Sequence, residues 1–209
     1  MIRKGLGGGN TITGLNFEKR RDVLAILSHA KGYSVKGNIV YFEGKEVARS
    51  YRKTGLYIFL KSKGVDYKKY VSKRLLPDEA LYVIVNNTLF VIEIKYQQVS
   101  GSVDEKLQTC DFKKKQYKKL MAPLNIEVEY IYVLSSWFKK PEYKDTLDYI
   151  ISVGCQYYFN YLPLKKLELP VPKSYNFAET NRNKKVKSIL YASLCLSCLR
   201  RGGGPSQGL

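Results

Sequence analysis

Two apolar segments separated by Asn86-Asn87 occupy the middle of the chain. Asparagine tolerates a positive φ, so this pair predicts a tight turn between two antiparallel strands over residues 80–85 and 88–96. Side chains alternate between the two faces of a strand, and Glu93 and Lys95 therefore share one face near the end of the second strand. The pattern predicts a buried hairpin that carries a carboxylate and an ammonium at its rim.

Helical and strand periodicities alternate along the rest of the chain. Ser102 followed by Glu105 forms a capping box, which predicts the start of a helix. The predicted helices cover 15–31, 68–76, 102–121 and 141–153, and the other predicted strands cover 33–35, 38–42, 45–48, 56–60, 125–134 and 155–162. This order of elements indicates an α/β fold with a mixed β-sheet flanked by α-helices.

The composition predicts one folded domain and a tail. Residues 1–162 form the domain, which includes the glycine-rich segment 5–14, and residues 163–209 are a loose tail rich in Pro, Lys and Asn. A single Cys-X-X-Cys at 195–198 cannot close a tetrahedral zinc site by itself. The abrupt change in composition over 188–209 fits either a native tail or a non-native extension, and we assign this segment no function.

Composition and charge indicate which class of molecule the protein binds. The 209 residues are 44% hydrophobic, which indicates a globular protein rather than a disordered one. The formal net charge is +18, from 36 Lys and Arg against 18 Asp and Glu. Such an excess of positive charge attracts a polyanion and releases counterions on binding, so nucleic acid is the leading partner.

Other features argue against a membrane or secreted protein. No stretch reaches the roughly 18 uninterrupted apolar residues of a membrane span, and the N-terminus lacks an apolar signal segment. The four cysteines are too few and too scattered for a disulfide scaffold. We therefore expect an intracellular, reducing compartment such as the cytoplasm, and no membrane partner.

Three ionisable residues of the hairpin could form a catalytic site. Asp78 begins the first strand and lies close enough, in a hairpin, to complete a site with Glu93 and Lys95. Two carboxylates suit Mg²⁺, which binds through one or two carboxylates together with waters and substrate phosphate. The lysine could hold and help to deprotonate a water, or neutralise charge on a phosphate. This combination is typical of phosphodiester hydrolysis.

The same residues resemble a known signature. Pro77-Asp78 followed by Glu93-Ile94-Lys95 is similar to the PD-(D/E)XK motif of the restriction-endonuclease-like nuclease superfamily. The resemblance implies a restriction-endonuclease-like core and a Mg²⁺-dependent DNA endonuclease, in particular a sequence-specific type II restriction enzyme. It also implies double-stranded DNA as substrate, a homodimer and a cognate DNA methyltransferase.

A second match lies near the N-terminus. Residues 8–18, Gly-Gly-Asn-Thr-Ile-Thr-Gly-Leu-Asn-Phe-Glu, resemble the opening of a group of small restriction-type nucleases. The resemblance implies that Glu18, in the first turn of the predicted helix, assists at the metal site, although an acidic residue there also suits the helix dipole. It places Asn10 and Thr11 among the DNA-binding residues.

Basic residues suggest further DNA contacts. In the superfamily, the helix after the Glu-X-Lys strand often faces the scissile phosphate, which makes Lys106, Lys113, Lys114 and Gln116 candidates. Residues 49–63 interleave basic and aromatic side chains, a pattern that suits either a nucleic-acid face or a solvated surface. Two alternatives stay open: a non-catalytic basic nucleic-acid-binding module, and a structure-specific resolvase or repair nuclease on the same fold.

Overall fold

A seven-stranded mixed sheet forms the centre of the domain. The computed structural model describes residues 13–17, 22–97 and 103–172. The strand order is β2-β3-β4-β5-β6-β7-β8; neighbours are antiparallel from β2 to β6 and parallel from β6 to β8. The strands are β2 (Tyr33–Lys36), β3 (Ile39–Phe42), β4 (Lys45–Ser50), β5 (Glu79–Val83), β6 (Thr88–Lys95), β7 (Glu127–Leu134) and β8 (Gln156–Phe159).

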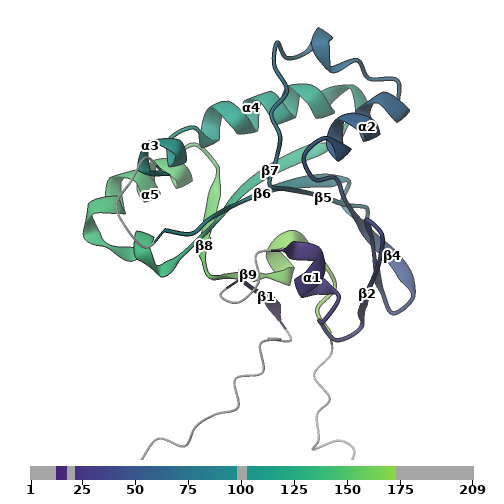
Figure 1. Cartoon of the computed structure of the whole chain (residues 1–209), viewed down its shortest axis with the longest axis horizontal. Coiled ribbons are helices and arrows are strands. Elements are labelled where there is room, and N and C mark those ends of the chain that lie inside the picture. The colour runs from purple at the N-terminus through teal and green to yellow at the C-terminus, as the bar shows by residue number, and fades with distance from the viewer. Residues whose placement is uncertain (1–12, 18–21, 98–102, 173–209) are drawn as a thin grey trace, which may run out of the picture. The chain divides into compact units, whose positions relative to one another are not determined.

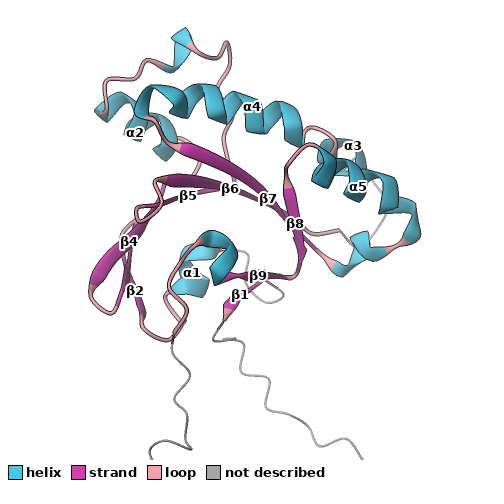
Figure 2. Cartoon of the chain, turned by 180° about the vertical axis from the view of Figure 1, so that it is seen from behind, coloured by secondary structure: helices cyan, strands magenta, loops and turns pink. Residues whose placement is uncertain are grey.

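Helices cover one face of this sheet, and a smaller layer covers the other (Figures 1 and 2). The first face carries α2, α3, α4 and α5; the second carries α1 and a two-stranded sheet of β1 and β9. These elements are α1 (Val23–Leu27), α2 (Gly55–Ser62), α3 (Val103–Leu107), α4 (Cys110–Met121), α5 (Lys144–Ser152), β1 (Gly14–Asn16) and β9 (Tyr161–Pro163). The α/β class and the mixed sheet flanked by helices are confirmed.

The central hairpin is the predicted one. β5 pairs antiparallel with β6 in a register that places Val83 opposite Thr88. Asn87 adopts a φ of 54° in the turn, and its side chain accepts a hydrogen bond from the Tyr82 hydroxyl (2.7 Å). A positive φ is tolerated best by Gly and Asn, which explains the asparagine at this point.

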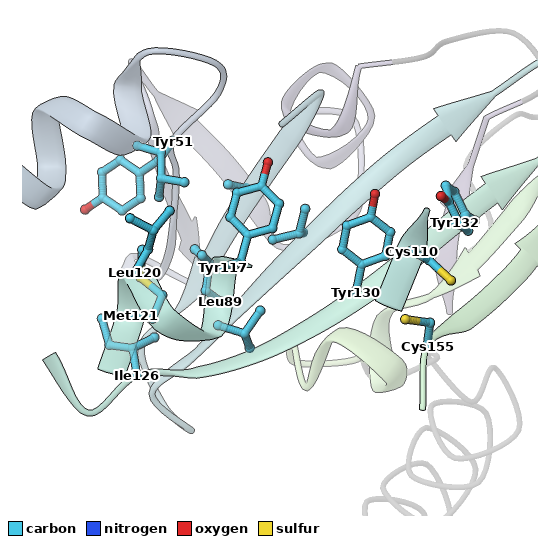
Figure 3. Close-up of a cluster of buried hydrophobic side chains, with 14 of the residues drawn as sticks. Tyr51, Leu89, Cys110, Tyr117, Leu120, Met121, Ile126, Tyr130, Tyr132 and Cys155 are labelled. Carbon is cyan, nitrogen blue, oxygen red and sulfur yellow. The ribbon is translucent and has the colours of Figure 1, made fainter. Parts of the chain in front are cut away.

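Strands β6 and β7 are buried on both faces because each face has its own apolar cluster. Leu89 and Val91 point towards α4 and α2, where they join the cluster in Figure 3, which also holds the buried free thiols of Cys110 and Cys155. Phe90 and other side chains of opposite parity pack with the α1 layer. Double coverage explains why these strands are nearly continuous apolar runs.

Residues 56–60 form a helix, so the predicted strand there is wrong. Leu56, Phe59 and Leu60 lie on the buried side of α2 and pack on the sheet. Their spacing of three and four residues is helical, and this spacing prevailed over the apolar, aromatic content that suggested a strand.

The predicted helix over residues 15–31 is also wrong in its first part. Gly14–Asn16 form β1, and the helix begins only at Val23, where the Asp22 side chain caps the backbone N–H of Ala25 (2.9 Å). A Cβ on Gly14 would lie 2.2 Å from the Tyr161 ring, so a larger residue at this position would require the Tyr161 side chain to move.

Three further boundaries differ from the prediction. The helix expected over 102–121 divides into α3 and α4, and the strand expected over 155–162 divides into β8 and β9 at Asn160, whose φ is 56°. The helix expected over 68–76 is reduced to a 3₁₀ turn at Tyr67–Lys69. The strand expected over 125–134 and the helix expected over 141–153 are present as β7 and as a 3₁₀ turn followed by α5.

The compact unit extends beyond the predicted boundary at residue 162. Pro163 pairs with Gly14, and Leu164, Leu167 and Leu169 are buried in the α1 layer. The unit therefore ends at Pro172 rather than at residue 162. Over residues 13–17, 22–97 and 103–172, every helix falls short of the length and hydrophobicity that a membrane span requires.

Candidate active site at the end of the central hairpin

The structure brings Asp78, Glu93 and Lys95 together. Lys95 Nζ lies 2.7 Å from Glu93 Oε2 and 3.2 Å from Asp78 Oδ2. The backbone N–H of Ile94 also donates to Asp78 Oδ2 (3.3 Å). The antiparallel register makes this geometry possible, because Glu79 opposite Ile92 places Asp78 beside the last residues of β6.

The cluster lies at the carboxyl end of a parallel strand pair. Glu93 and Lys95 are in the last residues of β6, which runs parallel to β7, and they point to the face that α4 covers. The carboxyl ends of parallel strands are where ligands commonly bind in α/β sheets, because the loops that leave there diverge. The position is therefore suitable for a substrate-binding site.

Burial changes steeply across the cluster. The Glu93 side chain is 6% exposed, Lys95 is 20% exposed, and Asp78 is 47% exposed. A ligand would therefore approach from the side of Asp78, with Glu93 at the base. An ionised carboxylate as buried as that of Glu93 requires a compensating positive charge.

Two lysines supply that charge. In addition to Lys95, Lys113 of α4 places its Nζ 3.4 Å from Glu93 Oε1. Burial lowers the pKa of Lys95, but the negative charges and hydrogen bonds of Glu93 and Asp78 outweigh this effect, and its pKa lies above its ordinary value. Lys95 is therefore a cation at neutral pH, which suits it to hold a water or neutralise charge and leaves it a poor base in this arrangement.

Tyrosine rings pack behind Glu93. Tyr117 of α4 lies 6.5 Å from Tyr130 between ring centroids, and Tyr130 lies 5.4 Å from Tyr132 (Figure 3). Burial is the main reason that the pKa of each hydroxyl is raised, and the charge of Glu93 adds to it. Neutral aromatic groups thus separate Glu93 from solvent on this side.

A second acidic cluster lies on the opposite face of the same hairpin. Glu79 Oε1 accepts hydrogen bonds from the Ser50 hydroxyl (2.6 Å) and from the Ala80 backbone (3.1 Å), and its Oε2 accepts from Arg52 Nε (2.8 Å). Arg52 also donates to both carboxylate oxygens of Asp22. This cluster was not predicted from the sequence, although a glutamate that opens an apolar strand is a signal for one.

This second cluster fixes the chain around Asp78. The backbone N–H of Tyr51 donates to Ala80 O (2.7 Å), and that of Lys53 donates to Pro77 O (3.1 Å). Together with the Glu79 contacts, these bonds hold residues 77–80 against the end of β4. The backbone on both sides of Asp78 is therefore held by hydrogen bonds, although the Asp78 side chain is half exposed.

The predicted DNA-binding residues have different surroundings. Lys106 is exposed, and Gln116 is half-buried on α4. Lys114 is buried, and its ammonium contacts Glu129 (3.2 Å) and the Gly154 carbonyl (2.5 Å), which favours a packing role over the predicted DNA contact. Asn10, Thr11 and Glu18 lie outside the described residues.

The basic and aromatic residues of segment 49–63 are also divided by their contacts. Arg49 pairs with Glu46, Arg52 belongs to the Glu79 cluster, and Tyr51 is buried. Lys53, Lys61 and Lys63 are exposed and are absent from the ion pairs of the described residues. Only part of this segment is therefore free to bind an anion.

The donor set of the first cluster fits Mg²⁺. Asp78 and Glu93 offer hard carboxylate oxygens at a partly open position, and Mg²⁺ needs only one or two protein carboxylates because waters and substrate phosphate complete its shell. Within residues 13–17, 22–97 and 103–172, no group of three or more His, Cys, Asp or Glu side chains is arranged to hold a metal. A pair of carboxylates such as Asp78 and Glu93 is smaller than the groups to which this statement applies.

Comparison with known proteins gave no matching family model, curated protein or solved structure. The chemical interpretation of the site therefore depends on its own residues and on the short motif that they form.

Proposed function

We propose that the protein is a Mg²⁺-dependent DNA endonuclease of the PD-(D/E)XK type, with a restriction-endonuclease-like core and the specificity of a type II restriction enzyme. The observation that supports this proposal is that the carboxylates of Asp78 and Glu93 both lie within 3.2 Å of the Lys95 ammonium, at the carboxyl end of β6. The large positive charge of the chain suits a polyanionic substrate.

Each residue has a role in this proposal. Asp78 and Glu93 would hold the ion, which supplies Lewis-acid stabilisation of the phosphoryl oxygens when it is bound. Lys95 orients the attacking water and offsets the negative charge that develops on the phosphate. Lys113 supplies a second positive charge beside the buried Glu93, 3.4 Å from its Oε1.

The remaining partners are part of the same proposal. Cleavage of both strands at a palindromic site suits a homodimer with two equivalent sites. A restriction activity requires that host DNA be protected, which a cognate DNA methyltransferase would do. Glu18 would assist at the metal site, and Asn10 and Thr11 would contact DNA.

The test is an incubation of plasmid and phage-length DNA with the purified protein, in Mg²⁺ or in chelator. A Lys95→Ala variant and a Lys36→Ala variant are compared with the wild type. Lys36 is a matched control because it removes the same charge from β2, at the edge of the sheet. We expect discrete Mg²⁺-dependent fragments from the wild type and from Lys36→Ala, and none from Lys95→Ala.

The outcomes separate the candidate functions. Binding without cutting under every divalent metal would reject catalysis and leave a basic nucleic-acid-binding module. A strong preference for branched over linear DNA would instead indicate a resolvase or a repair nuclease.

A further inference from the structure

The connection between α2 and β5 carries an unpaired basic surface. It rises beyond α2 and returns to β5, whose first residue, Glu79, directly follows Asp78 (Figure 1). Its cationic side chains are all exposed, and none of them takes part in an ion pair of the described residues. Together with the equally exposed Lys61 in the last turn of α2, these side chains are here called the α2–β5 basic surface: Lys61, Lys63, Lys68, Lys69, Lys73 and Arg74.

A pocket of about 340 Å³ forms part of this surface. Lys61 and Arg74 line it together with Tyr57, Tyr67 and the turn between α2 and the 3₁₀ turn. The Arg74 guanidinium lies 4.7 Å from the ring centroid of Tyr67 and 5.3 Å from that of Tyr57. Its planar face is therefore held by aromatic rings.

The rings that hold Arg74 are themselves fixed. Tyr57 is buried, and its hydroxyl donates to Leu75 O (2.9 Å) and accepts from Leu75 N (2.7 Å). Tyr67 meets Tyr57 edge to face at 5.2 Å between centroids. The guanidinium thus loses little conformational freedom when it binds a ligand, which favours affinity.

The contacts of Arg74 differ from those of the other well-placed arginines. Arg49 and Arg52 use their N–H groups on carboxylates, whereas Arg74 stacks through its face and has no carboxylate partner among the described residues. Stacking leaves the N–H edge free, and a guanidinium edge beside an ammonium is suited to bind a phosphate group. Asp66 also lines the pocket, where its carboxylate accepts a hydrogen bond from the Lys68 backbone (3.1 Å).

The pocket is tied to the candidate active site by a short, anchored stretch of chain. Leu75 is held by the Tyr57 hydroxyl, and the Pro77 carbonyl is held by the Lys53 backbone. Four residues of extended chain span at most about 14 Å, which limits the distance between the Cα atoms of Arg74 and Asp78. This length corresponds to the rise of about four nucleotides along one DNA strand.

We propose that the α2–β5 basic surface binds the phosphate backbone of the DNA strand that crosses the Asp78 site, with Arg74 and Lys61 as its anchoring pair. The identity of the ligand as substrate DNA rests on the proposed nuclease function. The phosphate-binding geometry itself does not depend on catalysis.

The test measures binding of a mixed-sequence DNA duplex in chelator, by fluorescence anisotropy over a range of salt concentrations. Arg74→Ala should weaken binding about tenfold and should reduce the salt slope by about one. Lys61→Ala, a change at an exposed side chain, should act in the same direction. Arg74→Lys keeps the positive charge but lacks the planar guanidinium that stacks on the tyrosine rings. Its binding affinity should therefore lie between those of Arg74→Ala and the wild type.

Two further variants sharpen the result. Lys36→Ala removes one positive charge from β2, at the edge of the sheet, where the Lys36 ammonium lies 5.9 Å from the centroid of the Tyr41 ring. This variant should bind DNA as the wild type does. Asp66→Asn removes the negative charge from the pocket and should strengthen binding. Thermal unfolding of each variant shows that the fold is retained.

The result can overturn this inference independently of the nuclease proposal. Binding by Arg74→Ala and Lys61→Ala that equals that of Lys36→Ala would reject the basic surface, even if the wild type cuts DNA. Weakened binding by Arg74→Ala, with no cutting by any form of the protein in any metal, would reject the nuclease and retain the surface. Failure of the wild type to bind the duplex would reject both.

Discussion

Glu79 and Glu93 are both buried, and they lie on opposite faces of one hairpin. The Glu79 side chain is 2% exposed and that of Glu93 is 6% exposed, so both carboxylates are removed from water to a similar extent. Glu79 accepts hydrogen bonds from a hydroxyl, a backbone N–H and the Nε–H of Arg52. The partners of Glu93 are the flexible ammonium groups of Lys95 and Lys113.

The difference indicates which carboxylate can change partners. The arginine that binds Glu79 is also bound by Asp22, so two carboxylates fix its position. The lysines of Glu93 are 20% and 25% exposed and can turn towards solvent or a phosphate. Similar burial therefore accompanies fixed partners on the α1 face and exchangeable partners on the α4 face.

The largest expected effect is the loss of DNA cleavage in Glu93→Gln. An amide removes the negative charge that would bind Mg²⁺, and cleavage should fall by about 10³-fold, the scale of one lost charge-stabilising group. The free energy of unfolding should change by less than about 1 kcal/mol, because Lys95 keeps Asp78 as a partner and both lysines can reach solvent. Cleavage assays and urea unfolding measure the two effects. A large loss of stability would show that Glu93 is structural, like Glu79.

A smaller effect, on stability rather than on chemistry, is expected for Glu79→Ala. It leaves the buried Ser50 hydroxyl and the Nε–H of Arg52 without an acceptor, while Arg52 keeps its bonds to Asp22, and the loss should cost about 1–3 kcal/mol. Urea unfolding measures this loss. Glu79→Gln, which keeps a neutral acceptor, is the control and should lie between the wild type and the alanine variant. Equal stability of all three proteins would mean that the cluster does not hold the fold.

The smallest effect concerns acid pH and Asp22. The hydrogen bond from Arg52 is the main reason that the pKa of Asp22 lies below its ordinary value of 3.8. A lowered pKa in the folded state adds stability above the ordinary value, and this stability is lost as pH falls through the folded value. Asp22→Asn keeps a helix-capping acceptor but lacks the charge. The stability difference between the wild type and Asp22→Asn should therefore be greatest at neutral pH and should shrink below about pH 3.8, as unfolding at a series of pH values would show. A constant difference would exclude this electrostatic contribution.

The sequence predicted that Asp78, Glu93 and Lys95 lie close together, but it did not predict the contacts that hold them in place. Asp78, Glu93 and Lys95 are related by strand alternation and one hairpin register, which are local properties of the chain. The contact between Lys113 and Glu93 requires α4 to pack on β6, and no local pattern contains this information. Lys113 was accordingly predicted as a DNA contact and not as a partner of Glu93.

The errors in secondary structure have a similar cause. The pairing of β1 with β9 joins residues 14–16 to residues 161–163, and this long-range pairing overrode the helical periodicity that begins at Leu15. The Glu79 cluster likewise gathers side chains from β4, β5 and the start of α1. For α2 the information was local, because the spacing of Leu56, Phe59 and Leu60 is helical, and the error came from giving composition more weight than periodicity.

The β1–β9 pairing also sets an order of events during protein synthesis. Leu15 and Phe17 are completely buried, and the layer that buries them includes Leu162, Leu164 and Leu167. These residues must remain without their final partners until almost the whole domain has left the ribosome, because the contacts that enclose them join residues 14–17 to residues 161–169. The α4 face can form earlier, whereas the α1 face is completed last. A nascent chain that stalls before residue 161 would therefore expose an apolar sheet surface to chaperones or to aggregation.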